Sequence, residues 1–249
     1  MSAYIGIEHL RWKHSGIPAV VLGSGPSLRF TAGRKPGKRV LIAVNSASMI
    51  FPNADYYLSS DGNTARARHW RYVEDGTAHI LLHSIPMTFV QGRLGPDRVT
   101  LFEKEPGAWA LDRFASRLIF GFGSTHCAAH LAVILGCSPI FLIGCDCRFV
   151  GGKRHYWQFP GFEPDDIEDA EHAKLSEADW KARTLSHPYG QRYPGDDGST
   201  DNYLWESYNG WAAIKKSSPS VQILDASGGI LDRIFPTATI EQALGIKNA

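Results

Sequence analysis

The sequence has no excess of charge of either sign and no long apolar run. Its 26 Lys and Arg residues nearly balance its 25 Asp and Glu residues, for a formal net charge of +1. No overall field therefore draws the chain toward nucleic acid or a membrane surface. Residues 1–16 lack the apolar core of a signal peptide, and no apolar run approaches the ~20 residues of a membrane span. We expect a cytoplasmic protein with no membrane partner.

Cysteine is also scarce. The four cysteines, Cys127, Cys137, Cys145 and Cys147, lie in apolar or strand-like sequence without the spacing of a disulfide framework. Cys145 and Cys147 are not followed by a second pair, which excludes a zinc knuckle. We therefore expect buried structural thiols and a reducing compartment.

Apolar runs alternate with helix-like stretches along most of the chain. Expected strands cover residues 18–22, 39–44, 55–58, 79–82, 118–120, 138–146 and part of 221–235, and expected helices follow at 124–135, 203–216 and 239–245. This alternation predicts an α/β fold, a Rossmann-like three-layer α/β/α sandwich with a mostly parallel sheet. We expect one domain over residues 1–249. Residues 149–203 are polar and rich in Gly, Pro, Asp, His and Tyr, which indicates a lid-like insertion.

In a parallel α/β sheet, ligands bind beyond the carboxyl ends of the strands. The first expected strand ends in Gly23, Ser24, Gly25, Pro26 and Ser27. This loop is neither a P-loop, since no Gly-Lys-Ser/Thr follows, nor GxGxxG, since the third glycine is missing. Its two glycines would let the backbone approach a ligand, and Ser27 would cap the next helix. Taken alone, this loop fits a nucleotide cradle and a plain turn equally well; together with the second loop and the polar strand ends described next, the nucleotide-cradling loop is favoured.

A second loop of the same kind precedes the helix at 124–135. There Gly123 is followed by Ser124 and Thr125, either of which is expected to cap that helix and leave backbone donors at the same edge of the sheet. Asn45 and Ser60 follow the second and third strands. All of these residues are candidate contacts for a nucleotide.

Two carboxylates also end expected strands, Asp61 and Asp146. Together they could hold Mg²⁺ with substrate phosphates, or they could orient hydroxyl groups. The alternative is that each caps a turn.

The histidines divide into two groups. His126 and His130 lie four residues apart on one helical face, but no Glu stands between them as in HExxH, so buried or capping roles are favoured over a metal site. His155 and His187 fall in the insertion and are better placed for general-base work. The insertion also gathers aromatic residues that would stack a sugar or base or pack the insertion down: Tyr156, Trp157, Tyr189, Tyr193 and Tyr203.

Several motifs together resemble a known superfamily. They are GSGPSL at 23–28, Asn45, SSD at 59–61, the block GFGSTHCAAHLAVILGCSPIFLIGCDCRF at 121–149, GDDGSTDNYLWESYNGW at 195–211 and VQILDASGGILDRI at 221–234. The chain resembles the Rossmann-like superfamily of small bacterial sialyltransferases and 6-hydroxymethylpterin pyrophosphokinase-like proteins. The resemblance covers most of residues 18–245, and the 121–149 block is its distinctive part.

The sialyltransferase branch implies that the loop from Gly23 to Ser27, Asn45, Ser60 or Asp61, and the loop from Gly123 to Thr125 hold the nucleotide of a sugar donor. Ser24 stands where those enzymes carry Asn, and Asp61 lies near a donor-contacting Asn. Their general-base His aligns with Asp196, and His187 is the nearest histidine. The pyrophosphokinase branch instead implies ATP and Mg²⁺ held by Asp61 and Asp146.

These features predict a transferase that uses a nucleotide donor. Our first expectation is a glycosyltransferase that moves a sugar from a nucleotide-sugar to a hydroxyl acceptor, with Asp196 or His187 as base and Asp146 in the catalytic set. The alternatives are a Mg²⁺-dependent pyrophosphokinase that uses ATP and a non-catalytic nucleotide-binding protein. The acceptor is a small molecule or a modified nucleobase, the latter because compact chains of this kind are common in phages. The oligomeric state is left open.

Overall fold

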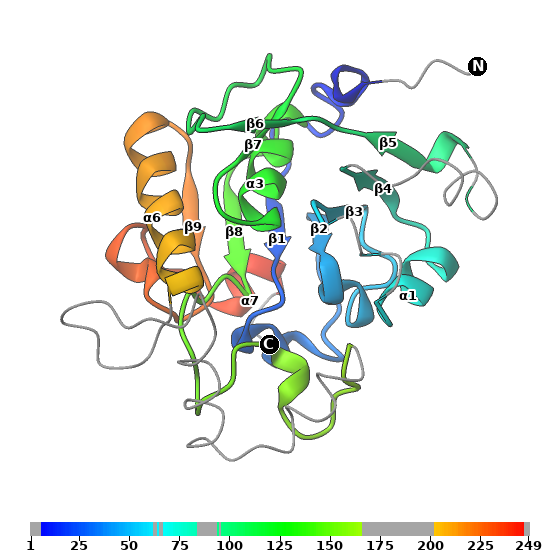
Figure 1. Ribbon diagram of the computed structural model, residues 1–249, viewed down its shortest axis with the longest axis vertical. Helices are drawn as coiled ribbons and strands as arrows, with labels where there is room; N and C mark the ends of the chain where they lie inside the picture. Colours follow the sequence, from blue (N-terminus) through cyan, green and yellow to red (C-terminus); the bar gives the residue numbers. More distant parts are fainter. Residues whose placement is uncertain are drawn as a thin grey trace.

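The computed structural model describes residues 6–61, 64, 67–83, 94, 96–165 and 202–246. Its centre is a parallel seven-stranded sheet in the order β5-β4-β3-β2-β1-β8-β9 (Figure 1). The strands are β1 Ala19–Leu22, β2 Val40–Val44, β3 Tyr56–Ser59, β4 His79–Leu82, β5 Val99–Leu101, β8 Ile140–Ile143 and β9 Ile223–Asp225. The first four strands agree with expectation to within one residue at each end.

The apolar character of the central strands follows from burial on both faces. In β1, Val21 packs into one apolar cluster with α3 (Ser124–Ile134) and α6 (Asn202–Ser217), whereas Val20 packs into a second cluster with α7 (Ile240–Leu244). A strand covered on both sides needs no polar alternation. The helices therefore form a layer on each face of the sheet, which confirms the Rossmann-like α/β/α sandwich. Within the described residues, no helix is long and apolar enough to cross a membrane.

The strand order places a topological switch at the middle of the sheet. From β1 the chain adds β2, β3, β4 and β5 outward on one side, and it then returns to place β8 on the other side of β1. The loops that follow β1 and β8 therefore diverge, and in open α/β sheets the crevice between such loops is where ligands bind.

Two expectations about the sheet were wrong in detail. Residues 118–120 form β7 (Leu118–Phe120), which pairs with β6 (Lys104–Pro106) in a separate two-stranded sheet. One edge strand of the main sheet is instead β5, which we did not identify. A run of three apolar residues packs equally well in either position, because its length carries no information about its partner strand.

Only part of the expected insertion can be compared with the structure. Residues 149–165 are described and contain the short 3-10 helix η6 (Tyr156–Gln158). His187, Asp196, Tyr189 and Tyr193 lie outside the described residues. Their predicted roles stay predictions.

Candidate functional site

The carboxyl ends of β1, β2, β3 and β8 open into one cavity of about 450 Å³. It lies where the switch in strand order places it. Twelve of the candidate site residues are described, and Gly23 and Ser27 are the two that do not line the cavity. The ten that do are Ser24, Gly25, Pro26, Asn45, Ser60, Asp61, Gly123, Ser124, Thr125 and Asp146.

Asp146 and Ser27 join the two strand ends at the switch. The Asp146 side chain is buried, and it accepts hydrogen bonds from the Ser27 backbone N–H at 3.1 Å and from Ser27 Oγ at 2.9 Å. Ser27 Oγ in turn accepts from the backbone N–H of Gly144 at 2.9 Å. Burial raises the pKa of Asp146 to about 7, although the hydrogen bonds from Ser27 oppose this shift.

We had expected Ser27 to cap the following helix, and this expectation is wrong. That helix is the short 3-10 helix η2 (Pro26–Thr31), whose N-cap residue is Gly25, and no side chain caps it. The Ser27 hydroxyl instead bonds to a residue 119 positions away in the sequence.

The two glycines of the first loop are needed because this loop packs tightly against the end of β8. A Cβ atom on Gly23 would collide with the carbonyl oxygen of Gly144, and one on Gly25 would collide with the Asp146 carboxylate. Both added Cβ atoms would meet protein atoms, so these glycines allow the ends of β1 and β8 to lie close together. We had predicted that they allow a ligand to lie close to the backbone.

The second loop is also held by its hydroxyl group. Ser124 Oγ lies 2.6 Å from Ser60 Oγ and accepts from the Ser60 backbone N–H at 3.1 Å, which ties the start of α3 to the end of β3. Gly123 is the N-cap residue of α3, and no side chain caps this helix. The expected capping by Ser124 or Thr125 is therefore wrong, although both residues line the cavity.

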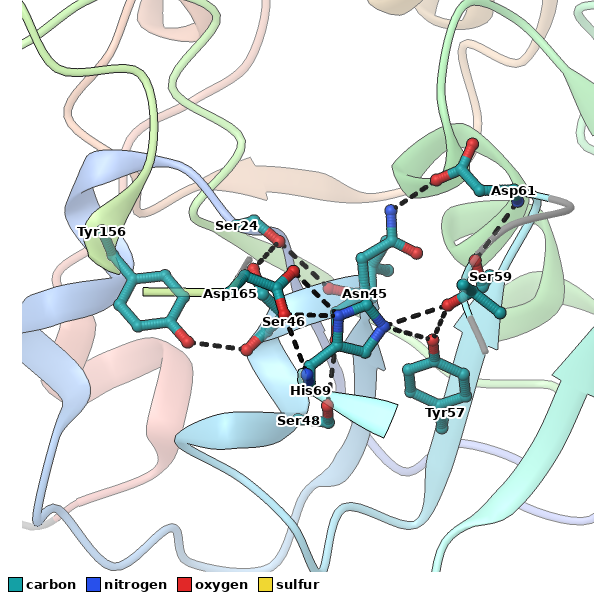
Figure 2. A network of polar contacts seen from close by, with 12 residues as sticks. Ser24, Asn45, Ser46, Ser48, Tyr57, Ser59, Asp61, His69, Tyr156 and Asp165 are labelled. Carbon is teal, nitrogen blue, oxygen red and sulfur yellow. Dashed lines mark hydrogen bonds and ion pairs between the residues drawn. The ribbon is translucent and has the colours of Figure 1, made fainter. Parts of the chain in front are cut away.

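Asn45 and Asp61 present hydrogen-bond acceptors to the cavity. Asn45 Nδ2 donates to Asp61 Oδ2 at 2.8 Å (Figure 2). Because a carboxylate only accepts, this contact orients the amide and leaves Asn45 Oδ1 as the free acceptor. That oxygen is buried, and no described residue donates to it. The pair suits a ligand group that donates, such as a hydroxyl or an amine.

Ser24 belongs to a second chain of contacts in the same view. Tyr156 Oη donates to the Ser46 carbonyl at 2.7 Å, and Ser46 Oγ donates to Ser24 Oγ at 2.8 Å (Figure 2). The Tyr156 backbone N–H also donates to the Ser24 carbonyl at 3.1 Å. The segment after β8 is thereby attached to the loops after β1 and β2.

Two arginines from this same segment complete the cavity wall. The guanidinium group of Arg154 lies 5.7 Å from the ring centroid of Phe149 and 5.5 Å from that of Tyr203. Arg148 lines the cavity too, and its buried Nε finds no hydrogen-bond partner in the described ranges. Neither arginine was among our candidates. The signal for Arg148 was its place two residues after the strand-ending Asp146, whereas nothing local marks Arg154.

His155 lines the cavity in a neutral form. Burial, with the neighbouring charge of Arg154, lowers its pKa to about 3, and its ring stacks on Trp157 at 5.0 Å. A base of such low pKa accepts protons poorly near neutral pH. The expected general-base role therefore does not suit His155.

His126 and His130 have structural roles, which confirms the expectation of buried histidines. His126 Nδ1 accepts from the Phe122 backbone N–H at 3.2 Å, and its Nε2 donates to the Ser207 carbonyl at 3.1 Å. Burial lowers its pKa to about 4. His130 similarly accepts from the Ile119 N–H and donates to a backbone carbonyl. Both rings are committed to the backbone and are not free to chelate a metal.

A buried polar network lies behind the turn that carries Asp61. His69 Nδ1 is 2.8 Å from Asp165 Oδ2, and His69 Nε2 is 2.9 Å from Tyr57 Oη (Figure 2). His69 Nε2 also lies 3.0 Å from Thr64 Oγ1. The Thr64 backbone N–H donates to the Asp61 carbonyl at 3.3 Å. Of these five residues, only Asp61 lines the cavity. The network therefore supports the cavity wall from outside.

The expected magnesium ion is not tested by this geometry. Among the described residues, no group of three or more His, Cys, Asp or Glu side chains is placed to hold a metal ion. Asp61 bonds to Asn45, and both oxygens of Asp146 accept from Ser27. The four cysteines are free and buried, as expected.

Comparison with known proteins gives one structural likeness. No protein-family model and no curated protein sequence matches the chain. Among solved structures, it is similar to the MAf glycosyltransferase from Magnetospirillum magneticum AMB-1, with a TM-score of 0.54 and 14% sequence identity. The match covers 97% of this chain and 38% of that one, so this chain spans well under half of that protein's length. At this identity the likeness shows a shared Rossmann-like fold.

Proposed function

We propose that the chain is a nucleotide-donor-dependent transferase, and that it moves a glycosyl group from a nucleotide-sugar bound in the cavity to a hydroxyl acceptor. One observation carries this proposal. Asn45 Oδ1, Arg148 Nε and Trp211 Nε1 are buried without hydrogen-bond partners among the described residues, and all three residues line the same cavity. Buried polar atoms in this state cost free energy unless a ligand satisfies them.

The two kinds of group in the wall match the two ends of a nucleotide. Asn45 and Asp61 offer acceptors, which suit ribose hydroxyls or a base amine. Arg148 and Arg154 offer guanidinium groups, which bind phosphate oxygens. A cavity of about 450 Å³ also lies within the usual size range of small-molecule sites. The shared fold with a glycosyltransferase supports the choice of a sugar as the group transferred.

The proposed reaction needs three functions from the protein. The acceptor oxygen forms a bond to the anomeric carbon, while the bond from that carbon to the donor phosphate oxygen breaks and its electron pair leaves with the phosphate. Arg148 and Arg154 stabilise the charge on this leaving group. The acceptor proton passes to a base, for which Asp196 or His187 remains our prediction.

Thermal-shift measurements with CMP, UDP, GDP and ATP, each with and without Mg²⁺, test the proposal. We expect stabilisation by a nucleoside monophosphate or diphosphate, because a ligand that binds only the folded state raises its melting temperature. Asn45→Ala should lose this stabilisation. The matched control is Asn53→Ala, since Asn53 is exposed and does not line the cavity.

The other outcomes separate the alternatives. Stabilisation by ATP only in the presence of Mg²⁺ would favour the pyrophosphokinase, for which the presence of Asp61 and Asp146 in the lining of one cavity is the supporting feature. A shift with nucleotides but no hydrolysis or transfer of any nucleotide-sugar would favour a binding protein. No response to any nucleotide would overturn all three readings.

A further inference from the structure

Three aromatic rings and one arginine form a continuous row of contacts, and all of them except Phe149 line the cavity. Phe149 and Tyr203 flank the guanidinium group of Arg154 at 5.7 and 5.5 Å, and Phe122 meets Tyr203 edge to face at a centroid distance of 5.6 Å. We call Phe149, Arg154, Tyr203 and Phe122 the aromatic ladder. Its members come from the segment after β8, from α6 and from the loop before α3, so three separate parts of the chain build it.

The ladder runs from the core to the open side of the cavity. Phe149 is 8% exposed, whereas Tyr203 is 38% and Phe122 is 37% exposed. Phe122 and Tyr203 both line the cavity. Large rings held at the solvent-exposed edge of a ligand cavity present apolar surface that a bound molecule can cover.

The space beside Tyr203 is left open by a glycine. Gly123 lines the cavity next to Phe122, and a Cβ atom added to it would find only Tyr203 Oη within contact range, at 3.6 Å. Gly123 is not in the left-handed backbone region, so its conformation does not demand glycine. Its lack of a side chain leaves the two rings and the tyrosine hydroxyl accessible from the cavity.

We propose that Phe122 and Tyr203 form the acceptor subsite and bind a pyranose ring through its apolar C–H face; this rests on the glycosyl transfer proposed above. The donor phosphates bind at Arg148 and Arg154, and because Arg154 contacts Tyr203, an acceptor on the exposed rings lies next to the leaving group. Tyr203 Oη lies at the same edge and can bond to an acceptor hydroxyl.

The angle between the two rings decides the class of acceptor. The planes of Phe122 and Tyr203 meet at 64°, and the guanidinium group of Arg154 lies over the Tyr203 ring. The rings therefore form a corner rather than a parallel slot. A flat nucleobase stacks on one aromatic face, whereas a saturated ring, which is thicker and carries axial C–H groups, contacts both walls of the corner. The corner thus favours a sugar over a nucleobase.

Saturation-transfer NMR tests this subsite directly. The probes are methyl β-D-galactopyranoside and methyl α-D-mannopyranoside, with thymidine and cytidine as the nucleobase arm and glycerol as a ringless hydroxyl. We expect saturation of the C–H protons of at least one pyranoside with the wild-type protein. Phe122→Leu and Tyr203→Leu should each reduce that signal at least threefold, because leucine keeps the apolar volume without the ring. Tyr203→Phe, which keeps the ring but lacks the hydroxyl group, should reduce it less than Tyr203→Leu does.

Phe114→Leu is the matched control, because Phe114 is 64% exposed but contacts Trp12 and does not line the cavity. It should leave the signal unchanged.

Circular-dichroism melts confirm that each variant folds, and nucleotide thermal shifts on the same variants report the donor site separately. A pyranoside signal unchanged in folded Phe122→Leu and Tyr203→Leu, or no pyranoside signal in the wild type, or a signal for nucleosides alone, would overturn the acceptor proposal. If the wild-type protein showed no thermal shift with any nucleotide, the proposed function would be overturned instead.

Discussion

Asp146 Oδ2 accepts a hydrogen bond from Ser27 Oγ at 2.9 Å, and this contact joins the ends of β1 and β8 across the switch in strand order. A carboxylate and a serine at the base of a cavity resemble catalytic groups, yet here each satisfies the other. Because both oxygens of Asp146 accept from Ser27, we expect this carboxylate to fix the shape of the cavity. Its predicted place in the catalytic set stays a prediction.

The raised pKa of Asp146 predicts how stability varies with pH. Its pKa rises from an ordinary 3.8 to about 7 on folding, so between these values the folded state binds more protons than the unfolded state. The contribution of Asp146 to the free energy of unfolding therefore falls as pH rises from about 4 to about 7. Asp146→Asn removes this titration. Urea denaturation from pH 4 to 8 should show the variant gaining stability relative to wild type as pH rises, and a constant difference would contradict the assignment.

His126 should act with the opposite sign. Burial lowers its pKa from 6.5 to about 4, so the unfolded state binds more protons in this range and stability is lost as pH falls from about 6.5 to about 4. His126→Gln keeps an acceptor and a donor for the Phe122 N–H and the Ser207 carbonyl but does not titrate. In the same denaturation series, the variant should gain relative to wild type toward acid pH. If it gained toward neutral pH, the ring would not be held neutral by burial.

A pair of glycine variants separates structural need from ligand access. Gly23→Ala places a methyl group against the Gly144 carbonyl, and backbone there cannot move without parting β1 from β8. We expect a loss of about 1–3 kcal/mol or failure to fold. Gly123→Ala meets only Tyr203 Oη at 3.6 Å and should cost no more than about 1 kcal/mol, the preference for Gly over Ala at an N-cap. Chemical denaturation of both variants measures this, and equal losses would refute the distinction.

Much of the site could be predicted because apolar runs followed by polar residues mark the carboxyl ends of parallel strands, and those ends share one edge. The hydrogen-bond partner of each polar residue could not be predicted. Ser27 bonds to Asp146, and Ser60 to Ser124, across 119 and 64 positions. Such pairs depend on the order of the strands, which local patterns do not contain. For the same reason, we predicted that the loop beginning at Gly23 contacts a ligand, whereas Gly23 packs against Gly144.

The buried pair of His69 and Asp165 should matter to the cavity although neither residue lines it. Asp165 accepts from His69 at both the backbone N–H and Nδ1, and His69 contacts Thr64, which bonds to Asp61. Asp165→Ala should cost about 2 kcal/mol or more of stability, since hydrogen bonds to a charged group are lost from a buried site. It should also speed hydrogen exchange in the turn that follows β3 and weaken nucleotide binding.

Glu163→Ala is the matched control for Asp165→Ala. Glu163 lies two residues away and also pairs with a residue of α1 (Trp70–Asp75), but this partner, Arg71, is more than half exposed. Exposed pairs of this kind contribute about 0–1 kcal/mol. Unfolding, hydrogen exchange and nucleotide binding should therefore all stay near wild type in Glu163→Ala. If Asp165→Ala destabilised the fold without changing exchange in the turn or nucleotide affinity, the pair would not position Asp61.

Arg148 offers the most direct test of how the proposed donor is held. Its buried Nε lacks a partner in the structure as described, so a phosphate that bonds to it gains a charge-assisted hydrogen bond worth about 1.5–3 kcal/mol. Arg148→Gln should weaken nucleotide binding by roughly 10- to 100-fold in calorimetric titrations, and the wild type should lose more affinity than the variant between 50 and 300 mM salt because ionic contacts are screened. Arg113→Gln is the control, since Arg113 is exposed over Trp12. Equal affinities and equal salt slopes in wild type and Arg148→Gln would place the phosphates away from the segment that follows β8.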